Sequence, residues 1–110
     1  MSRSDAIKTL RLSGELEISR KNEIREVLRR DEHDSAILLD LSEVTYADSI
    51  ALTELLRFCA DAKSANVPVA LVVQTPQFAR IVQYAGLSSA FKTFADCDAA
   101  LRHLAESVGS

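Results

Sequence analysis

The segment at positions 36–41, AILLDL, constrains the fold of this chain more than any other. A strand with one buried face alternates apolar and polar residues, whereas this short run is apolar at nearly every position. We therefore expect a strand in the interior of a sheet, covered on both faces. A polar loop follows, and Asp48 and Ser49 then stand where a helical apolar rhythm starts. These two residues are predicted at a strand-to-helix corner.

A second buried strand is predicted at 69–73, opened by Pro68, a position at which proline is tolerated. The helix between the strands buries one face, made of Leu55, Leu56, Cys59 and Ala62, and turns the other face to solvent, with Glu54, Arg57, Asp61 and Lys63. Such a βαβ unit needs parallel strands and a right-handed crossover. Both carboxyl ends then lie at one edge of the sheet, where open α/β sheets bind ligands and partners. Asp48 and Ser49 are placed at that edge.

The N-terminal part adds one strand and one helix. The strand is predicted at 7–12 and ends in a turn at 13–14, because Ser and Gly interrupt the apolar pattern there. A helix is predicted at 20–30, with Ser19 as its N-cap and with an ion pair between Glu26 and Arg30. A polar break separates this helix from the buried strand.

The C-terminal part adds two helices and a short strand. Thr75 and Pro76 begin a helix that Gly86 ends, a strand follows at 91–94, and Asp96 caps a last amphipathic helix. The predicted order alternates strand and helix four times. The fold class is therefore α/β, a single domain over residues 1–110, with a mixed but mostly parallel sheet of four to five strands and four helices.

Charge and hydropathy exclude several classes of partner. The 13 basic and 16 acidic side chains give a net charge of -3, without the basic footprint of a nucleic-acid-binding protein. No apolar run approaches the roughly 20 residues that a membrane span needs, and the N-terminus lacks the apolar core of a signal peptide. We expect a cytoplasmic protein with no direct nucleic-acid partner and no membrane insertion.

No pattern for catalysis or cofactor binding is present in the sequence. His33 and His103 fall in different elements, away from a cysteine at ligand spacing, so we expect both on the surface and no metal site. With only three glycines there is no phosphate loop and no dinucleotide fingerprint, so no cofactor is expected. Cys59 and Cys97 are predicted as buried, reduced thiols on apolar helix faces.

Three polar residues near the corner have a simple structural interpretation. Ser49 lacks a G-x-S-x-G context, which argues against a nucleophilic serine. Helices commonly begin at Asp or Ser because the side-chain oxygen accepts a bond from a free backbone N–H, so Asp48 and Ser49 are first predicted as capping residues. Asp40 is predicted as a strand-end residue beside a turn.

The chain nevertheless resembles a known family over almost its whole length. The matching segments are LSGELE at 12–17, LDLSEVTYADS at 39–49, TPQFARI at 75–81, AGL at 85–87 and Phe91. In this order and spacing they resemble the STAS domain of bacterial anti-sigma factor antagonists. The most specific part is an aspartate followed by a serine at the start of the second helix. The chain departs from the family at Ile50 and Ala51, where serine or threonine and then glycine are usual, and at Glu17, where aspartate is usual.

The resemblance implies a binding module and not an enzyme. It implies that Ser49 is phosphorylated by an anti-sigma factor that is also a serine kinase, and that a PP2C-type phosphatase removes the phosphate. The unphosphorylated form would bind the anti-sigma factor and free a sigma factor, which regulates transcription by partner switching. The implied partner surface comprises Glu15, Glu17, Asp48, Ser49, Ile50, Ala51 and Thr53.

Two other functions remain open at the level of sequence. STAS domains also serve as cytoplasmic accessory subunits of ABC transporters, including lipid transporters, where they bind the ATPase. A small-ligand or nucleotide sensor could use the same edge of the sheet. A monomer is expected for the free protein, because a switch needs its working surface unoccupied.

Overall fold

The computed structural model describes residues 7–31 and 34–109. The elements in chain order are β1 (Ile7–Leu16), the 3-10 helix η2 (Ile18–Arg20), α1 (Lys21–Val27), β2 (Ala36–Ala47), α2 (Ser49–Ser64), β3 (Val69–Val72), α3 (Pro76–Tyr84), α4 (Leu87–Ala90), β4 (Lys92–Phe94) and α5 (Cys97–Gly109). The predicted α/β class and the alternation of strands and helices are confirmed. The short helix α4 was not predicted.

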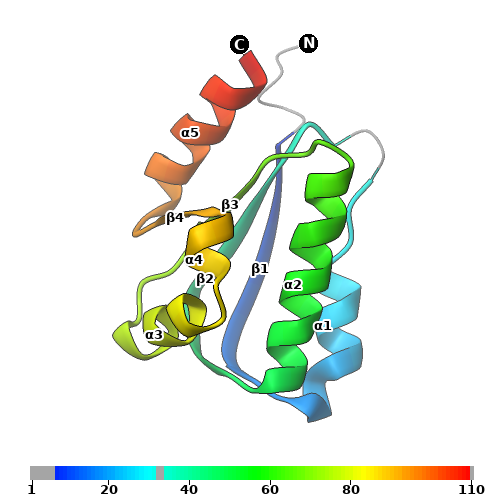
Figure 1. Ribbon diagram of the computed structural model, residues 1–110, viewed down its shortest axis with the longest axis vertical. Helices are drawn as coiled ribbons and strands as arrows, with labels where there is room; N and C mark the ends of the chain where they lie inside the picture. The colour runs from blue at the N-terminus through cyan, green and yellow to red at the C-terminus, as the bar shows by residue number, and fades with distance from the viewer. Residues whose placement is uncertain (1–6, 32–33, 110) are drawn as a thin grey trace.

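The four strands form one sheet in the order β1-β2-β3-β4, and all three pairings are parallel. The predicted sheet was mixed, and the structure instead has every described strand running the same way. β2 lies between β1 and β3, and its residues 36–41 are all buried, as the apolar run predicted. The ends of β1 and β2 and the start of α2 meet at the lower end of the molecule (Figure 1).

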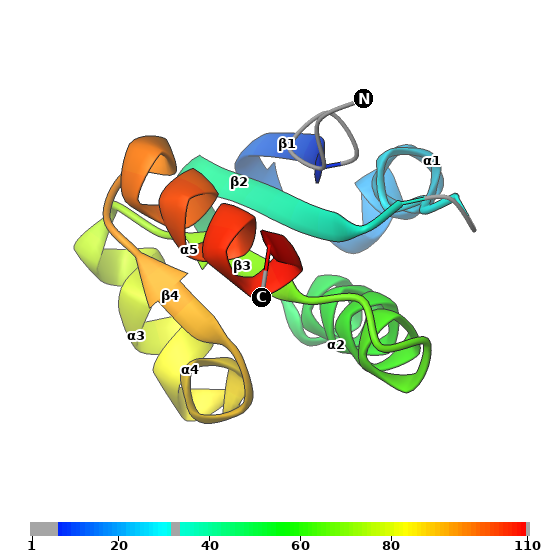
Figure 2. The ribbon, with the colours of Figure 1, turned by 90° about the horizontal axis from the view of Figure 1, so that it is seen from above.

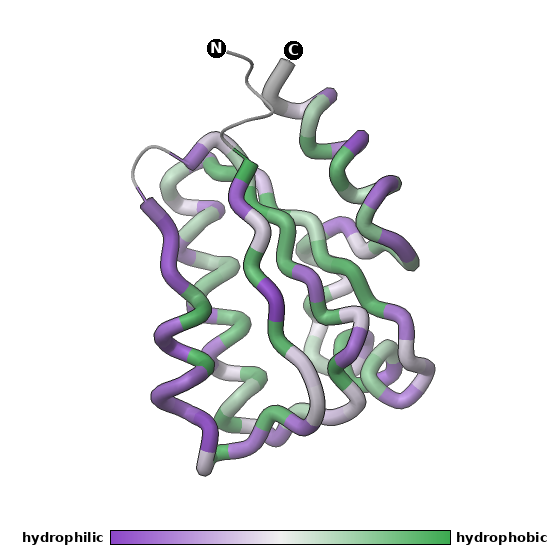
Figure 3. Tube along the Cα trace, turned by 180° about the vertical axis from the view of Figure 1, so that it is seen from behind, coloured by the Kyte–Doolittle hydropathy of each residue, from purple (hydrophilic) through white to green (hydrophobic). Residues whose placement is uncertain are grey.

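The helices cover the two faces of the sheet unequally. On one face, α1 to α4 pack on alternate residues of β2, among them Ile37, Leu39 and Leu41. Figure 2 shows α1 beside α2 and α3 beside α4 along this face. On the other face, α5 is the one helix among residues 7–31 and 34–109 that packs on a smaller cluster, which contains Leu38 and Leu104. In the view from behind (Figure 3), α5 lies toward one side of the sheet, where it packs on β2, β3 and β4.

Both N-terminal strands are longer than predicted. The turn predicted at 13–14 is wrong: Gly14 adopts a φ of +76°, which glycine tolerates, inside β1, and the strand continues to Leu16. The polar loop predicted after residue 41 is also wrong, because β2 continues to Ala47. Two register shifts in the β1–β2 pairing accommodate the polar residues of this part.

The region of α1 differs most from its prediction. Ser19 lies within η2 and is not a helix N-cap, and α1 ends at Val27. The ion pair predicted between Glu26 and Arg30 is wrong, because the Arg30 Nε lies 2.8 Å from an Asp61 carboxylate oxygen in α2.

The solvent-facing position predicted for Glu54 is wrong as well. Glu54 lies on the side of α2 that packs against α1 and is nearly buried there. Its carboxylate accepts a 3.0 Å hydrogen bond from Arg25 of α1. The bond from Arg25 lowers the pKa of Glu54, against the opposing effect of burial. The two ion pairs of α2, with Arg25 and with Arg30, therefore tie α2 to the segment around α1.

Candidate functional site

Asp48 joins three segments at the strand-to-helix corner. Its backbone N–H donates to the Leu16 carbonyl at the end of β1, at 3.0 Å. Its Oδ1 accepts from the Ala51 N–H at 2.9 Å, which caps α2, and its Oδ2 accepts from the Ile18 N–H at 2.9 Å. The predicted capping role of Asp48 is confirmed, and the bond to Ile18 adds a link across 30 positions of sequence. Both carboxylate oxygens are therefore occupied.

Ser49 is the first residue of α2 and is exposed. Its carbonyl accepts the Thr53 hydroxyl at 2.8 Å, and Thr53 is exposed too. Over residues 7–31 and 34–109, the Ser49 hydroxyl takes part in none of the hydrogen bonds, and the cap of α2 is made by Asp48. Within the described residues, the Ser49 hydroxyl is therefore not engaged in holding the fold.

The other residues of the predicted partner surface fall into two groups. Glu15, Glu17 and Ile50 are exposed, and the amide link from Asp48 to Ile18 holds the end of β1 beside the start of α2. The Ala51 side chain is buried against the sheet, and only its N–H takes part in the corner, as the donor to Asp48.

Two apolar residues at this corner were not predicted as part of the site. Ile18 is 58% exposed and Tyr46 is 45% exposed, and Ile50 joins them at 36%. Tyr46 pairs in register with Glu15 on the neighbouring strand. The only sequence signal for Ile18 and Tyr46 was an apolar residue among polar ones, which is too weak to mark a surface.

Arg20 shapes the end of β1 next to this corner. One guanidinium nitrogen donates to the Ser13 carbonyl at 2.7 Å and to the Glu15 carbonyl at 2.9 Å. The remaining nitrogens pair with Glu23. This bond to Arg20 lowers the pKa of Glu23. Arg20 thus donates hydrogen bonds to two β1 carbonyls that the irregular β1–β2 pairing around Gly14 would otherwise leave to bond with water.

A second polar cluster lies on the sheet face that α5 covers. Asp40 is 1% exposed, and its carboxylate accepts the Arg11 Nε at 2.9 Å and the Ser42 N–H at 3.1 Å. The prediction of a strand-end residue is wrong, because β2 continues past Asp40. Burial opposes the ionisation of this carboxyl, but the bonds from Ser42 and Arg11 outweigh it and lower its pKa.

Both cysteines are free thiols, and their surroundings differ. Cys59 in α2 is fully buried, as predicted, and burial raises its pKa to about 12. Cys97 is only half-buried, at the start of α5. Its burial and then the neighbouring carboxylate of Asp40 raise the pKa of this thiol. Neither environment favours the thiolate that a reactive cysteine needs.

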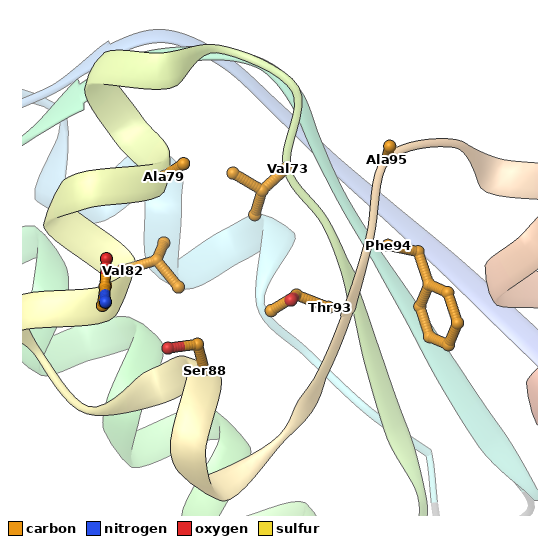
Figure 4. Close-up of a pocket in the computed structure, with 8 residues that line it drawn as sticks. Val73, Ala79, Val82, Ser88, Thr93, Phe94 and Ala95 are labelled. Carbon is orange, nitrogen blue, oxygen red and sulfur yellow. The ribbon is translucent and has the colours of Figure 1, made fainter.

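A pocket of about 330 Å³ lies at the β4 side of the molecule, away from the corner. It is lined by Val73, Ala79, Val82, Gln83, Ser88, Thr93, Phe94 and Ala95. Figure 4 shows that the Phe94 ring turns to the other side of β4, where it contacts His103. The lining residues are uncharged, and the volume is at the small end for ligand pockets.

The described residues contain neither a cluster of metal ligands nor a helix that could span a membrane. Within 7–31 and 34–109, no three His, Cys, Asp or Glu side chains gather as metal ligands. No helix in that part of the chain has the length and apolarity to cross a membrane. His103 is half-buried against Phe94, whereas His33 lies outside the described residues.

Comparison with known proteins identifies relatives of this fold. The profile of the STAS domain family matches residues 1–100, and no curated protein matches the sequence. A sulfate transporter family protein from Wolinella succinogenes superposes with a TM-score of 0.79 at 15% identity, covering 96% of this chain and 89% of that one. An anti-sigma factor antagonist from Mycobacterium paratuberculosis superposes with a TM-score of 0.78 at 22% identity, covering 91% and 86%. At these identities the two structures establish a shared fold.

Proposed function

The chain belongs to the STAS domain family, and from this premise we propose that it is an anti-sigma factor antagonist switched by phosphorylation of Ser49. In its unphosphorylated form it binds an anti-sigma factor that is also a serine kinase, and thereby frees a sigma factor. The phosphorylated form does not bind, and a PP2C-type phosphatase restores it. The protein acts in the cytoplasm as a binding module, a monomer when free, and catalyses no reaction itself.

The observation that supports this proposal is that Asp48, and not Ser49, caps α2. Because Asp48 caps α2, the neighbouring hydroxyl is exposed and not needed for the fold. In the transfer step the Ser49 Oγ bonds to the γ-phosphorus of ATP while the bond from that phosphorus to its bridging oxygen breaks. ADP leaves with the bond's electrons, and the hydroxyl proton passes to a base of the kinase.

The physical effect of the phosphate fits a switch that preserves the fold. It adds close to two negative charges, at a helix N-terminus, where the helix dipole favours anions. It also adds them beside the carboxylate of Asp48, on a surface that the partner must cover. We therefore expect phosphorylation to change binding and not folding.

Intact-mass measurement of the protein from its own host, with fragmentation to locate the phosphate, tests the proposal. We expect the mass of one phosphoryl group on Ser49, absent from a Ser49→Ala variant and retained in Thr53→Ala. Thr53 is the matched control, because its exposed hydroxyl lies one helical turn away. Ser49→Ala should bind the kinase constitutively and Ser49→Asp should fail to bind, both with unchanged circular dichroism.

The alternatives give different results in the same measurements. A chain that stays unmodified under all growth conditions and co-purifies with an ABC ATPase would establish the accessory-subunit function instead. A thermal shift with a small uncharged ligand, without phosphorylation, would favour the sensor and direct attention to the pocket beside β4.

A further inference from the structure

A groove with a lysine from each of two elements lies where the C-terminus of α2 meets the start of β4. One of its cavities, of about 220 Å³, is lined by Lys63, Val67, Pro68, Phe91 and Lys92, among others. A second cavity, of about 270 Å³, shares Lys63, Val67 and Pro68 with the first, so the two cavities adjoin. We call the adjoining cavities and these five residues the lysine groove.

The lysine groove lies at the end of the sheet opposite to Ser49. Val69, which also lines the first cavity, pairs with Ile37 at the start of β2, whereas Ser49 follows the end of β2. Most of the length of β2 therefore separates the groove from the corner. A ligand in the groove leaves Asp48 and Ser49 uncovered, so the groove offers a binding site beyond the proposed function.

The charge of the lysine groove differs in sign from that of the whole chain. The chain has a net charge of -3, but the described side chains that line the two cavities include two lysines and no carboxylate. Lys63 and Lys92 are exposed, and within 7–31 and 34–109 neither belongs to an ion pair. The Lys63 ammonium instead lies 5.9 Å from the centroid of the Phe91 ring. The groove thus combines an apolar floor with two uncompensated cations.

The backbone beneath the lysine groove is fixed by hydrogen bonds. The N–H groups of Ala65, Asn66 and Val67 donate to carbonyls near the end of α2 at 2.8 to 3.2 Å. Asn66 has a φ of +61°, the left-handed conformation that commonly ends a helix, and the Pro68 carbonyl accepts the Ile37 N–H at 2.9 Å. The bonds to α2 weaken the negative end of its dipole, which would otherwise repel an anion. A fixed groove also loses less conformational entropy on binding.

We propose that the lysine groove binds a short peptide segment of a partner protein, in which acidic residues flank an apolar side chain. The apolar side chain packs on Val67, Pro68 and Phe91. The flanking carboxylates pair with Lys63 and Lys92, which supply the complementary charge. Each cavity is smaller than the roughly 300–1,000 Å³ of small-molecule pockets. Two adjoining cavities of this size suit neighbouring side chains of an extended peptide better than one compact ligand.

Selection from a library of short random peptides displayed on phage tests the proposal. The selection is run on the wild-type chain, on the lysine variant Lys63→Glu/Lys92→Glu, and on the control variant Lys21→Glu/Arg80→Glu. The control changes the net charge equally, at positions that do not line the groove. We expect the wild type and the control to select peptides with acidic residues around an apolar one, and the lysine variant to lose them. Selection of the same peptides by the lysine variant would overturn the proposal.

Fluorescence anisotropy with the most enriched peptide measures the two parts of the contact. We expect the lysine variant to bind about tenfold or more weakly, the control variant to keep the wild-type affinity, and wild-type binding to weaken as salt is added. Replacing the apolar residue of the peptide by serine should also weaken binding, without any change to the protein. Equal affinity for the serine peptide would contradict the apolar contact with Phe91.

Two other occupants of the groove give different results. Dimerisation of the wild type in analytical ultracentrifugation, lost in the lysine variant, would show that a second copy fills the groove and would overturn the proposal. Co-sedimentation with phosphatidylglycerol vesicles, lost in the lysine variant and kept in the control, would assign the groove to a membrane surface and overturn it as well. Because Lys63 and Lys92 are exposed, circular dichroism should show the lysine variant folded. Its phosphorylation at Ser49 should be unchanged, so this proposal and the proposed function fail independently.

Discussion

Both carboxylate oxygens of Asp48 accept backbone N–H groups, one from Ala51 in α2 and one from Ile18 at the start of η2. Asp48→Ala removes the helix cap and the link to Ile18 together, so we expect the free energy of unfolding to fall by about 2 kcal/mol. Asp48→Asn keeps a cap oxygen for Ala51 but presents an amide N–H to Ile18, and should cost about 1 kcal/mol. Urea unfolding measures both.

Asp96→Ala is the matched control, because Asp96 is exposed and caps α5 through one bond, to the Ala99 N–H at 2.8 Å. It should cost about 1 kcal/mol. A loss for Asp48→Ala no larger than for Asp96→Ala would show that the bond to Ile18 contributes nothing.

At the residue scale, sequence rules could predict the cap but not the link. Asp48 stands before a helical apolar rhythm, which is a local signal, and its capping was predicted. Its bond to Ile18 spans 30 positions and depends on how β1 and β2 pair, which no local pattern encodes. The identity of Ser49 as a phosphorylation site came from resemblance to a family and stays a prediction.

At the scale of elements, α5 is the sole helix packed on its face of the sheet within the described residues. Leu104 is fully buried there, and its neighbour Leu101 is 37% exposed on the same helix. We expect Leu104→Ala to lower the free energy of unfolding by about 3 kcal/mol, because it removes packing and leaves a cavity. Chemical denaturation monitored by circular dichroism measures this loss.

Leu101→Ala controls for the change in helix propensity, since it makes the same substitution one turn away. Its expected cost is below about 1 kcal/mol. Equal losses for the two variants would mean that α5 is not anchored to the sheet through Leu104.

Elements with an unbroken pattern were predicted well, and those with mixed patterns were not. The apolar run at 36–41 predicted a buried strand correctly, because nearly every position agreed. Residues 42–47 were missed, since their polar side chains and the register shifts hide the strand period. Glu54 was misplaced because helical spacing alone could not show that α1 would pack against that face and bring Arg25 to it.

At the scale of the whole molecule, acid should destabilise the fold. Three carboxyl groups have pKa values below their ordinary ones because each accepts hydrogen bonds. Asp40 accepts from Ser42 and Arg11, Glu23 accepts from Arg20, and Glu54 accepts from Arg25. Because each folded-state pKa is lower than the unfolded one, the stabilisation is fully present above about pH 5 and is lost as pH falls through the folded values. Urea midpoints measured from about pH 7 to pH 3 should therefore fall most steeply below about pH 4.5.

Asp40→Asn tests which carboxylate matters most. It should lower stability at neutral pH, where Arg11 loses its partner, and reduce the further loss in acid. Asp98→Asn, at an exposed position of α5, should keep the wild-type response to acid. An Asp40→Asn variant with the full acid response would contradict the role given to Asp40.

The strands of the sheet stand in space in the same order as in the chain, and each pairs in parallel with the next. During synthesis on the ribosome, each strand can therefore dock on the edge left by the one before it, without rearrangement. The side chains of Leu38 and Val72 nevertheless remain exposed to solvent until α5 has been synthesised, because α5 packs over them. We expect nascent chains stalled before α5 to bind chaperones that recognise apolar surface, and completed chains to be released from them.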